Sequence, residues 1–193
     1  VTGLLNADGK NNVLAVRLEN RPQSSRWYPG AGLYRNVRLV TTERVHVPVW
    51  GTQLTTPHVS AEYASVRLRT TIRNAGDADV CISTDIIAPD GKIVARKDNS
   101  RKINHGQPFE QNFLINAPSL WSPETPYLYK AVSKIYVDGK QTDEYTTRFG
   151  IRSIEIIADK GFFLNGKHRK FQGVCNHHDL GPLGAAVNVA ALS

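Results

Sequence analysis

The stretch "ASVRLRTTIRN" (residues 64–74) alternates apolar and polar side chains, and this alternation decides the fold of the chain. Val66, Leu68 and Ile72 fall on one face of an extended segment, while arginines occupy the other face. A period of two residues is typical of a β-strand with one buried face. The sequence therefore predicts a sheet whose apolar side is covered by other strands.

The same alternation continues through the middle of the chain. "VCISTDII" (80–87), "FEQNFLI" (109–115) and "YLYKAVSKIYV" (127–137) repeat it, with Pro-Asp-Gly and Asp-Gly turns between strands. Several short strands at this spacing predict an antiparallel β-sandwich from about residue 42 to about residue 150. Its predicted core comprises Val66, Leu68, Ile72, Val80, Ile82, Ile86, Phe113 and Ile135.

The segments on either side of the sandwich predict parts of other domains. Residues 1–41 hold two strand-like runs, "NNVLAVRLEN" and "GLYRNVRLV", and two strands alone do not make a stable domain. Residues 151–193 begin with a hairpin signal, Asn165-Gly166, and continue through a short apolar run and a polar loop into Ala-rich "AAVNVAALS". A strand, a loop and the start of a helix in this order predict the first unit of an α/β domain. Because each flank then holds only part of a domain, we expect the chain to be cut at both ends.

Charge and composition exclude two classes of partner. Lysines and arginines number 24 against 17 acidic residues, for a net charge of +7. The basic residues are dispersed and alternate with apolar ones, and their densest cluster, "ARKDNSRK", is interrupted by Asp98, so we interpret them as solvated strand faces rather than a nucleic-acid surface. No apolar run approaches the roughly 20 residues of a membrane helix, so no membrane contact is expected.

Two cysteines, Cys81 and Cys175, lie far apart in apolar, strand-like runs. We interpret them as small buried thiols, because two cysteines alone define neither a disulfide framework nor a metal site.

The run "FQGVCNHHDLGPLG" (171–184) stops abruptly at His177, His178 and Asp179. Titratable side chains at the end of a short hydrophobic strand usually line a site, although a merely structural loop is the simplest alternative. His-His-Asp would also suit a metal ion, but adjacent residues of an extended chain point apart, which disfavours a shared metal.

Four motifs give the chain a family resemblance. "NVLAVRLENRPQSSRWYPGAGLYRNVRLV", "APSLWSPETPYLY", "RFGIRSIEI" and "FFLNGKHRKFQGVCNHHD" occur in the order seen in glycoside hydrolase family 2, which contains β-galactosidases, β-glucuronidases and β-mannosidases. The resemblance implies a mainly β segment: the end of a jelly-roll sugar-binding domain (1–41), an immunoglobulin-like sandwich (42–150) and the first strand of a (β/α)8 catalytic barrel (151–193).

The resemblance also implies substrate-binding residues. "KFQGV" (170–174) resembles the first barrel strand, and the C-terminal ends of such strands form the active site. His177 and Asp179 then match family residues that contact the sugar in the −1 subsite, while His178 fills a variable position. Ser25 lies in a loop where some relatives carry an Asp that reaches the active site.

Three motifs have structural interpretations of their own. Trp121 in "LWSPETPYLY" is predicted to cover the sandwich core, and Gly150 in "RFGIR" is predicted to permit a bend or a close backbone approach. Trp27 and Tyr28 precede a Pro-Gly turn, where packing beneath the turn is favoured over a sugar platform.

The implied function is that of a segment of a retaining β-galactosidase that hydrolyses terminal β-galactosides. In the family both catalytic residues are glutamates on later barrel strands, so no catalytic residue is assigned within these 193 residues, and the chain alone is expected to be inactive. The alternatives are a β-glucuronidase, a β-mannosidase, or a non-catalytic β-sandwich module for carbohydrate binding or adhesion. "GVCNHHDLGPLGAAVN" most resembles the galactosidase branch.

No cofactor and no metal ion are expected. The expected partners are a carbohydrate substrate and the remaining parts of the same polypeptide, and an oligomer is compatible with the sequence.

Overall fold

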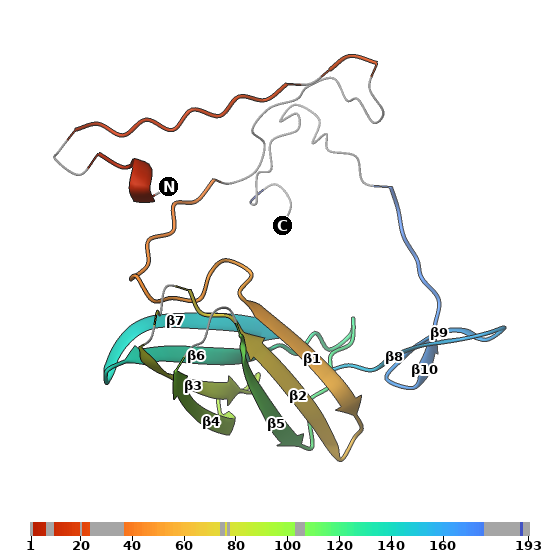
Figure 1. Cartoon of the computed structure of the whole chain (residues 1–193). Coiled ribbons are helices and arrows are strands. Elements are labelled where there is room, and N and C mark those ends of the chain that lie inside the picture. The colour runs from red at the N-terminus through yellow and green to blue at the C-terminus, as the bar shows by residue number, and fades with distance from the viewer. Residues whose placement is uncertain are drawn as a thin grey trace. The chain divides into compact units, whose positions relative to one another are not determined.

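In the computed structural model of this chain, the described residues are 2–6, 10–19, 21–23, 37–73, 76, 78–102, 107–175 and 190 (Figure 1). The chain divides into two compact units, one formed by residues 40–172 and the other by residues 1–39 with 173–193. Among the described residues of the second unit, the structure has one short 3-10 helix, η1 (Thr2–Leu4). The first unit contains every β-strand of the described residues.

The larger part of the first unit is a two-layered antiparallel β-sandwich. One sheet has the strand order β1 (Thr52–Val59), β2 (Tyr63–Thr70) and β5 (Phe109–Asn116). The other has the order β4 (Ile93–Lys102), β3 (Asp79–Ile87), β6 (Tyr129–Val137) and β7 (Lys140–Phe149). The chain passes between the layers after β2, β4 and β5 (Figure 1). The prediction of a mainly β chain with an immunoglobulin-like sandwich is confirmed.

A third, small sheet follows the sandwich, with the order β10 (Lys167–Arg169), β9 (Gly161–Leu164) and β8 (Ile154–Ile157). The β9–β10 hairpin turns at Asn165 (φ 50°) and Gly166 (φ 73°). The β6–β7 hairpin turns in the same way at Asp138 (φ 48°) and Gly139 (φ 77°). Two consecutive positive φ angles define the hairpin turn that Asn-Gly and Asp-Gly favour, so both predicted turns are confirmed.

The inner faces of the two sheets form the core. All eight predicted core residues are buried, each with at most 6% of its surface exposed. Pairing of Val66 with Phe113 and of Ile82 with Ile135 sets these side chains on the inner faces. Each fully buried apolar side chain contributes about 1.5–3 kcal/mol.

The edge strands differ from the sequence prediction. β4 runs to Lys102, well beyond the short strand "IVARK", and most of its residues are exposed. Its charged side chains suit an edge strand, where they hinder pairing with other chains. The sequence pattern does not predict β1, because threonines fill two of its four half-buried positions and Pro57 lies at an irregularity in the pairing with β2.

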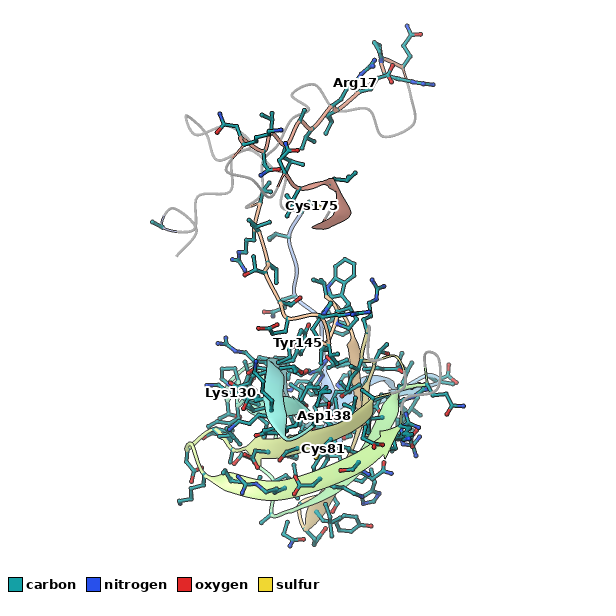
Figure 2. All side chains as sticks on the ribbon, turned by 60° about the vertical axis from the view of Figure 1, so that its left-hand side comes forward. Arg17, Cys81, Lys130, Asp138, Tyr145 and Cys175 are labelled. Carbon is teal, nitrogen blue, oxygen red and sulfur yellow. The ribbon has the colours of Figure 1, made fainter. Side chains whose placement is uncertain are left out.

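One further expectation is wrong, and one stays a prediction. Residues 170–174 lie outside the sheets of the described residues, so a barrel strand there stays a prediction. Phe171 packs against Phe162, with ring centroids 4.6 Å apart. The cysteines are not a pair of buried thiols: Cys81 is half-buried on the outer face of β3 (Figure 2), and Cys175 is exposed.

A layer of polar side chains crosses the core. Thr84 of β3 donates a hydrogen bond to Gln111 Oε1 of β5 at 2.7 Å, and its hydroxyl shares a second one with Ser133 of β6 at 2.9 Å. The Gln111 amide nitrogen donates to the Lys97 carbonyl at 3.0 Å and to Asn99 Oδ1 at 3.2 Å, both on β4. Gln111 is fully buried and thereby links its own sheet to two strands of the other.

The polar layer separates two apolar clusters. In β3, β5 and β6, and in β2 continued to Ile72 beyond its end, the inward residues follow the order apolar, polar, apolar; the polar residues are Thr70, Thr84, Gln111 and Ser133. The larger cluster comprises Ala64, Val66, Leu68, Ile86, Phe113, Ile115, Tyr129, Ala131, Phe149 and Ile151. The smaller one comprises Val47, Ile72, Val80, Ile82, Phe109 and Ile135.

Tyr129, the first residue of β6, fixes the loop that precedes it. Its ring packs against Phe149 at 5.6 Å, and its hydroxyl accepts a hydrogen bond from the Ser119 backbone N–H at 2.8 Å. A tyrosine at the start of this strand that bonds to backbone upstream is a hallmark of immunoglobulin-like sandwiches.

We predict that Gln111→Met lowers the free energy of unfolding of the 193-residue chain by about 1–3 kcal/mol, because the Lys97 carbonyl and the buried Thr84 hydroxyl each lose a partner. Urea unfolding followed by circular dichroism measures the change. Gln53→Met is the matched control: Gln53 is exposed on β1, and its replacement should stay within about 0.5 kcal/mol. Equal stability of the two variants would contradict a structural role for the polar layer.

Candidate functional site

The sequence-predicted substrate contacts fall outside the described residues. This holds for Ser25, His177 and Asp179, and likewise for His178 and the Trp27-Tyr28 pair. Their roles stay predictions. The described part of the candidate site is the segment that leads towards them from the end of β7.

We use the name joint for the residues through which this segment and the loop before β6 contact each other. It comprises Trp121 and Glu124 of that loop, residues 150–153, and Asn165 and Arg169 of the β9–β10 hairpin. All of these residues belong to the unit formed by residues 40–172.

Gly150 and Trp121 form the tightest contact of the joint. A Cβ atom at Gly150 would lie 2.9 Å from both Cβ and Cγ of Trp121, closer than carbon atoms pack. Next to them, the Trp121 N–H donates to the Ile151 carbonyl at 2.8 Å, and the Ile151 side chain is fully buried in the larger cluster. The predicted close approach at Gly150 is confirmed, and any larger residue there would push the tryptophan away.

The indole of Trp121 also meets a positive charge. The Arg152 guanidinium carbon lies 5.1 Å from the ring centroid, within the range of a cation–π contact. Trp121 therefore contacts both the backbone at Gly150 and a cation two residues further along the chain.

Asn165 ties the hairpin turn to the same tryptophan. Its side-chain oxygen accepts from the Ser153 N–H at 3.0 Å, and its backbone N–H donates to the Ser153 carbonyl, also at 3.0 Å. Its side-chain nitrogen donates to the Trp121 carbonyl at 3.0 Å. Asn165 thus supplies both the left-handed turn conformation and three hydrogen bonds, which fix the hairpin on the sandwich.

An ion pair holds the far strand of the hairpin. Arg169 Nη2 donates to Glu124 Oε2 at 2.7 Å, and its Nη1 donates to the other carboxylate oxygen. The hydrogen bond from Arg169 lowers the pKa of Glu124 to about 2. The Glu124 carboxylate therefore stays ionised at neutral pH and is no proton donor there.

Three other carboxyl groups of the described residues have a shifted pKa. They are Glu62, Asp85 and Asp90, and in each the pKa is lowered, chiefly by a side-chain hydrogen bond. A general acid for glycoside cleavage needs the opposite, a raised pKa. These carboxylates are suited to ion pairs and turns, as in the Asp85 pair with Arg96.

Within the described ranges, no three His, Cys, Asp or Glu side chains gather in a way that could hold a metal ion. No helix in this part of the chain is long and apolar enough to cross a membrane.

The sequence motifs indicate Trp121 and Gly150, but they do not indicate the residues that hold the joint together by hydrogen bonds and an ion pair. Asn-Gly indicated a turn, yet nothing local shows that the Asn165 amide reaches Trp121, 44 residues away. Glu124 and Arg169 are 45 residues apart, and no pattern connects them.

Comparisons with known proteins relate the chain to glycoside hydrolases. The family description "Glycosyl hydrolases family 2" matches residues 47–152. Beta-galactosidase BoGH2A of Bacteroides ovatus is 44% identical over 186 residues, which cover 94% of this chain and 22% of the relative. A beta-glucuronidase of Bacteroides fragilis is 31% identical over 204 residues, covering 97% of this chain and 29% of the relative.

Solved structures share the fold. A glycosyl hydrolase family 2 member from Bacteroides cellulosilyticus has a TM-score of 0.74 at 36% identity, covering 86% of this chain and 22% of its own. A beta-glycosidase from Bacteroides vulgatus has a TM-score of 0.75 at 32% identity, covering 86% of this chain and 21% of its own. The chain thus spans about a fifth to three tenths of the length of these relatives. Since the family match takes in more than half of the 193 residues and solved members share the fold, the chain belongs to glycoside hydrolase family 2.

Proposed function

We propose that the chain is a segment of a retaining β-galactosidase that hydrolyses terminal β-galactosides. The observation that carries the proposal is the 44% identity, over 186 residues, to a protein named beta-galactosidase. In this proposal residues 1–41 end a jelly-roll sugar-binding domain, residues 42–150 form the immunoglobulin-like sandwich, and residues 151–193 begin the catalytic (β/α)8 barrel.

A β-glucuronidase is the second candidate within the family. It is supported by the relative from Bacteroides fragilis named beta-glucuronidase, which is 31% identical. The higher identity to the galactosidase over a similar share of the chain favours a galactoside as substrate.

The proposed reaction needs two carboxyl groups outside this segment. One protonates the leaving oxygen and the other attacks the anomeric carbon, which forms a covalent glycosyl-enzyme that water then hydrolyses with retention. We place both on later strands of the barrel. The lowered pKa values of Glu62, Asp85, Asp90 and Glu124 do not suit the carboxyl that protonates the leaving oxygen, because a general acid needs a raised pKa.

Within the segment, His177 and Asp179 are proposed to contact the sugar in the −1 subsite, and Ser25 to approach it from a separate loop. An ionised Asp accepts two sugar hydroxyl groups, and a neutral His orients a third group. The proposed role of the joint is to fix the direction in which the chain leaves β10, shortly before Gln172 and the barrel segment. A small displacement of that segment would misplace groups that must align with the reacting carbon.

We predict that Asp179→Ala in the full-length enzyme lowers kcat/KM roughly tenfold to a hundredfold, because a hydrogen bond to a charged acceptor is lost. Steady-state kinetics with nitrophenyl β-galactoside measures the loss, and thermal unfolding checks that the fold is retained. His178→Ala is the neighbouring control and should lose much less, since adjacent residues of an extended chain point apart. Wild-type kinetics for Asp179→Ala would exclude it from the −1 subsite.

We predict that Gly150→Ala lowers the free energy of unfolding of the 193-residue chain by about 1–3 kcal/mol, because the new methyl group overlaps Trp121. Gly3→Ala is the control, since a Cβ there meets nothing within 4 Å. A double-mutant cycle with Trp121→Ala isolates the contact: the Gly150→Ala cost should largely vanish in that background. An unchanged cost would place the strain elsewhere.

We predict that the Glu124 carboxyl titrates with a midpoint near 2 and that Arg169→Gln returns it towards 4.5. Because the folded-state pKa is depressed, the stabilisation from this ion pair is complete above about pH 4.5 and is lost as the pH falls through 2. Carbon-detected NMR of the Glu124 carboxyl gives the midpoint directly. A midpoint near 4.5 in the unaltered chain would show that the pair does not form in solution.

A further inference from the structure

The small sheet of β8, β9 and β10 has one apolar side. Directly paired residues of antiparallel strands point to the same side of a sheet, so Ile156 of β8 shares its side with Phe162 of β9. Ile154 lies two residues before Ile156 and points to this side as well. Glu155 and its partner Phe163 point to the other side. We use the name apolar face for the side that carries Ile154, Ile156 and Phe162.

The β8 part of the apolar face has no cover in the described part of the chain. Ile156 is 81% exposed and Ile154 is 56% exposed, and the three strands extend away from the sandwich (Figure 1). A sheet with an apolar side buries that side against a second layer of structure. This chain matches only 22% of the length of beta-galactosidase BoGH2A, so the exposure shows which side needs a cover, not a side that is free in the whole protein.

The polypeptide that leaves the small sheet starts from the apolar face. Phe171 lies two residues beyond the end of β10, and its ring packs against Phe162 with the centroids 4.6 Å apart. Phe171 is itself 80% exposed. It therefore extends the apolar face, and the segment that follows it along the chain begins beside that face.

The chain that precedes the sandwich is attached at a distance from the apolar face. The Val47 N–H donates to Asp143 Oδ2 at 2.8 Å, near the start of β7. The small sheet follows Phe149, which is the last residue of β7. From Asp143 to Phe149 an extended strand rises roughly 20 Å. The preceding chain thus enters the sandwich at the opposite end of β7, which disfavours it as the cover.

A second copy of the chain is also a poor candidate for the cover. Stable interfaces between separate proteins bury about 800 Å² on each partner. The exposed side chains of Ile154, Ile156 and Phe171 do not supply that area. A segment of the same polypeptide needs less area, because the covalent link already holds it at a high effective concentration.

We propose that the apolar face docks against the N-terminal end of the catalytic barrel, where the polypeptide beyond residue 193 supplies the apolar side chains that cover it. The choice of this end rests on the proposed function, in which residues 170–174 are the first barrel strand. β10 ends at Arg169, directly before the N-terminal end of that strand. The strands of such a barrel run parallel, so their N-terminal ends lie together on the side away from the active site. The small sheet then closes this end of the barrel and has a stabilising role.

Photo-crosslinking of the full-length enzyme identifies what covers the apolar face. The photoreactive residue p-benzoylphenylalanine replaces Ile156 in one variant and Glu155, on the other side of β8, in the matched control. Irradiation followed by peptide mass mapping gives the residues that each position contacts. From position 156 we expect crosslinks, within the same polypeptide, to peptides beyond residue 193, and from position 155 several-fold fewer of them.

Ile156→Ser compares the same side chain in two contexts. In the 193-residue chain, where Ile156 is exposed, the melting temperature should stay within about 1 °C. In the full-length enzyme it should fall by roughly 2 °C or more, because a buried isoleucine is lost. The kcat/KM of the folded variant should stay within about twofold, since the apolar face lies at the end of the barrel away from the active site.

Crosslinks from position 156 to the segment before the sandwich or to a second copy, or none to peptides beyond residue 193, would overturn the proposal. Equal crosslinking from position 155, or an unchanged melting temperature of the full-length Ile156→Ser variant, would also overturn it. A loss of kcat/KM as large as that expected for Asp179→Ala would place the face at the wrong end of the barrel. Crosslinking does not depend on catalysis. If nitrophenyl β-galactoside is not hydrolysed, the proposed activity fails and the docking result stands.

Discussion

Gln111 lies fully buried between the two sheets, and its amide group joins β5 to β3 and β4 through Thr84, Lys97 and Asn99. Buried polar groups are costly without partners, so a register that leaves them unpaired is disfavoured. A slip of one residue would turn the polar layer outwards and bring charged side chains inwards. The same register carries Tyr129, at the start of β6, into the larger apolar cluster, on which the joint is then built.

The sequence predicts those parts of the fold that depend on local pattern. A two-residue period is a property of each strand, so the inner residues of β2, β3, β5 and β6 can be found before their partners are known. β1 escapes detection because Thr52, Thr56 and Pro57 weaken its period. The apolar run 170–174 has the composition of a strand, and its place in a barrel stays a prediction because a strand forms only beside a neighbour to pair with.

The candidate site is less accessible from sequence, because its geometry depends on contacts between distant residues. Trp121 and Gly150 stand out through their motifs, whereas the roles of Asn165, Glu124 and Arg169 depend on where the hairpin folds back. His177, Asp179 and Ser25 rest on family resemblance. We assign no chemistry to the sandwich or to the joint. In the proposed enzyme they set the direction of the chain that enters the barrel.

The central claim is that this segment supports a retaining galactosidase whose catalytic carboxylates lie outside it. Incubation of the full-length enzyme and of the 193-residue chain with a 2-deoxy-2-fluoro-β-galactosyl fluoride, followed by peptide mass mapping, tests it most directly, because this reagent traps the covalent glycosyl-enzyme. We expect one label, on a glutamate beyond residue 193 of the full-length enzyme, and none on the shorter chain. A label on any carboxylate within residues 1–193, such as Asp179 or Glu124, would contradict the claim.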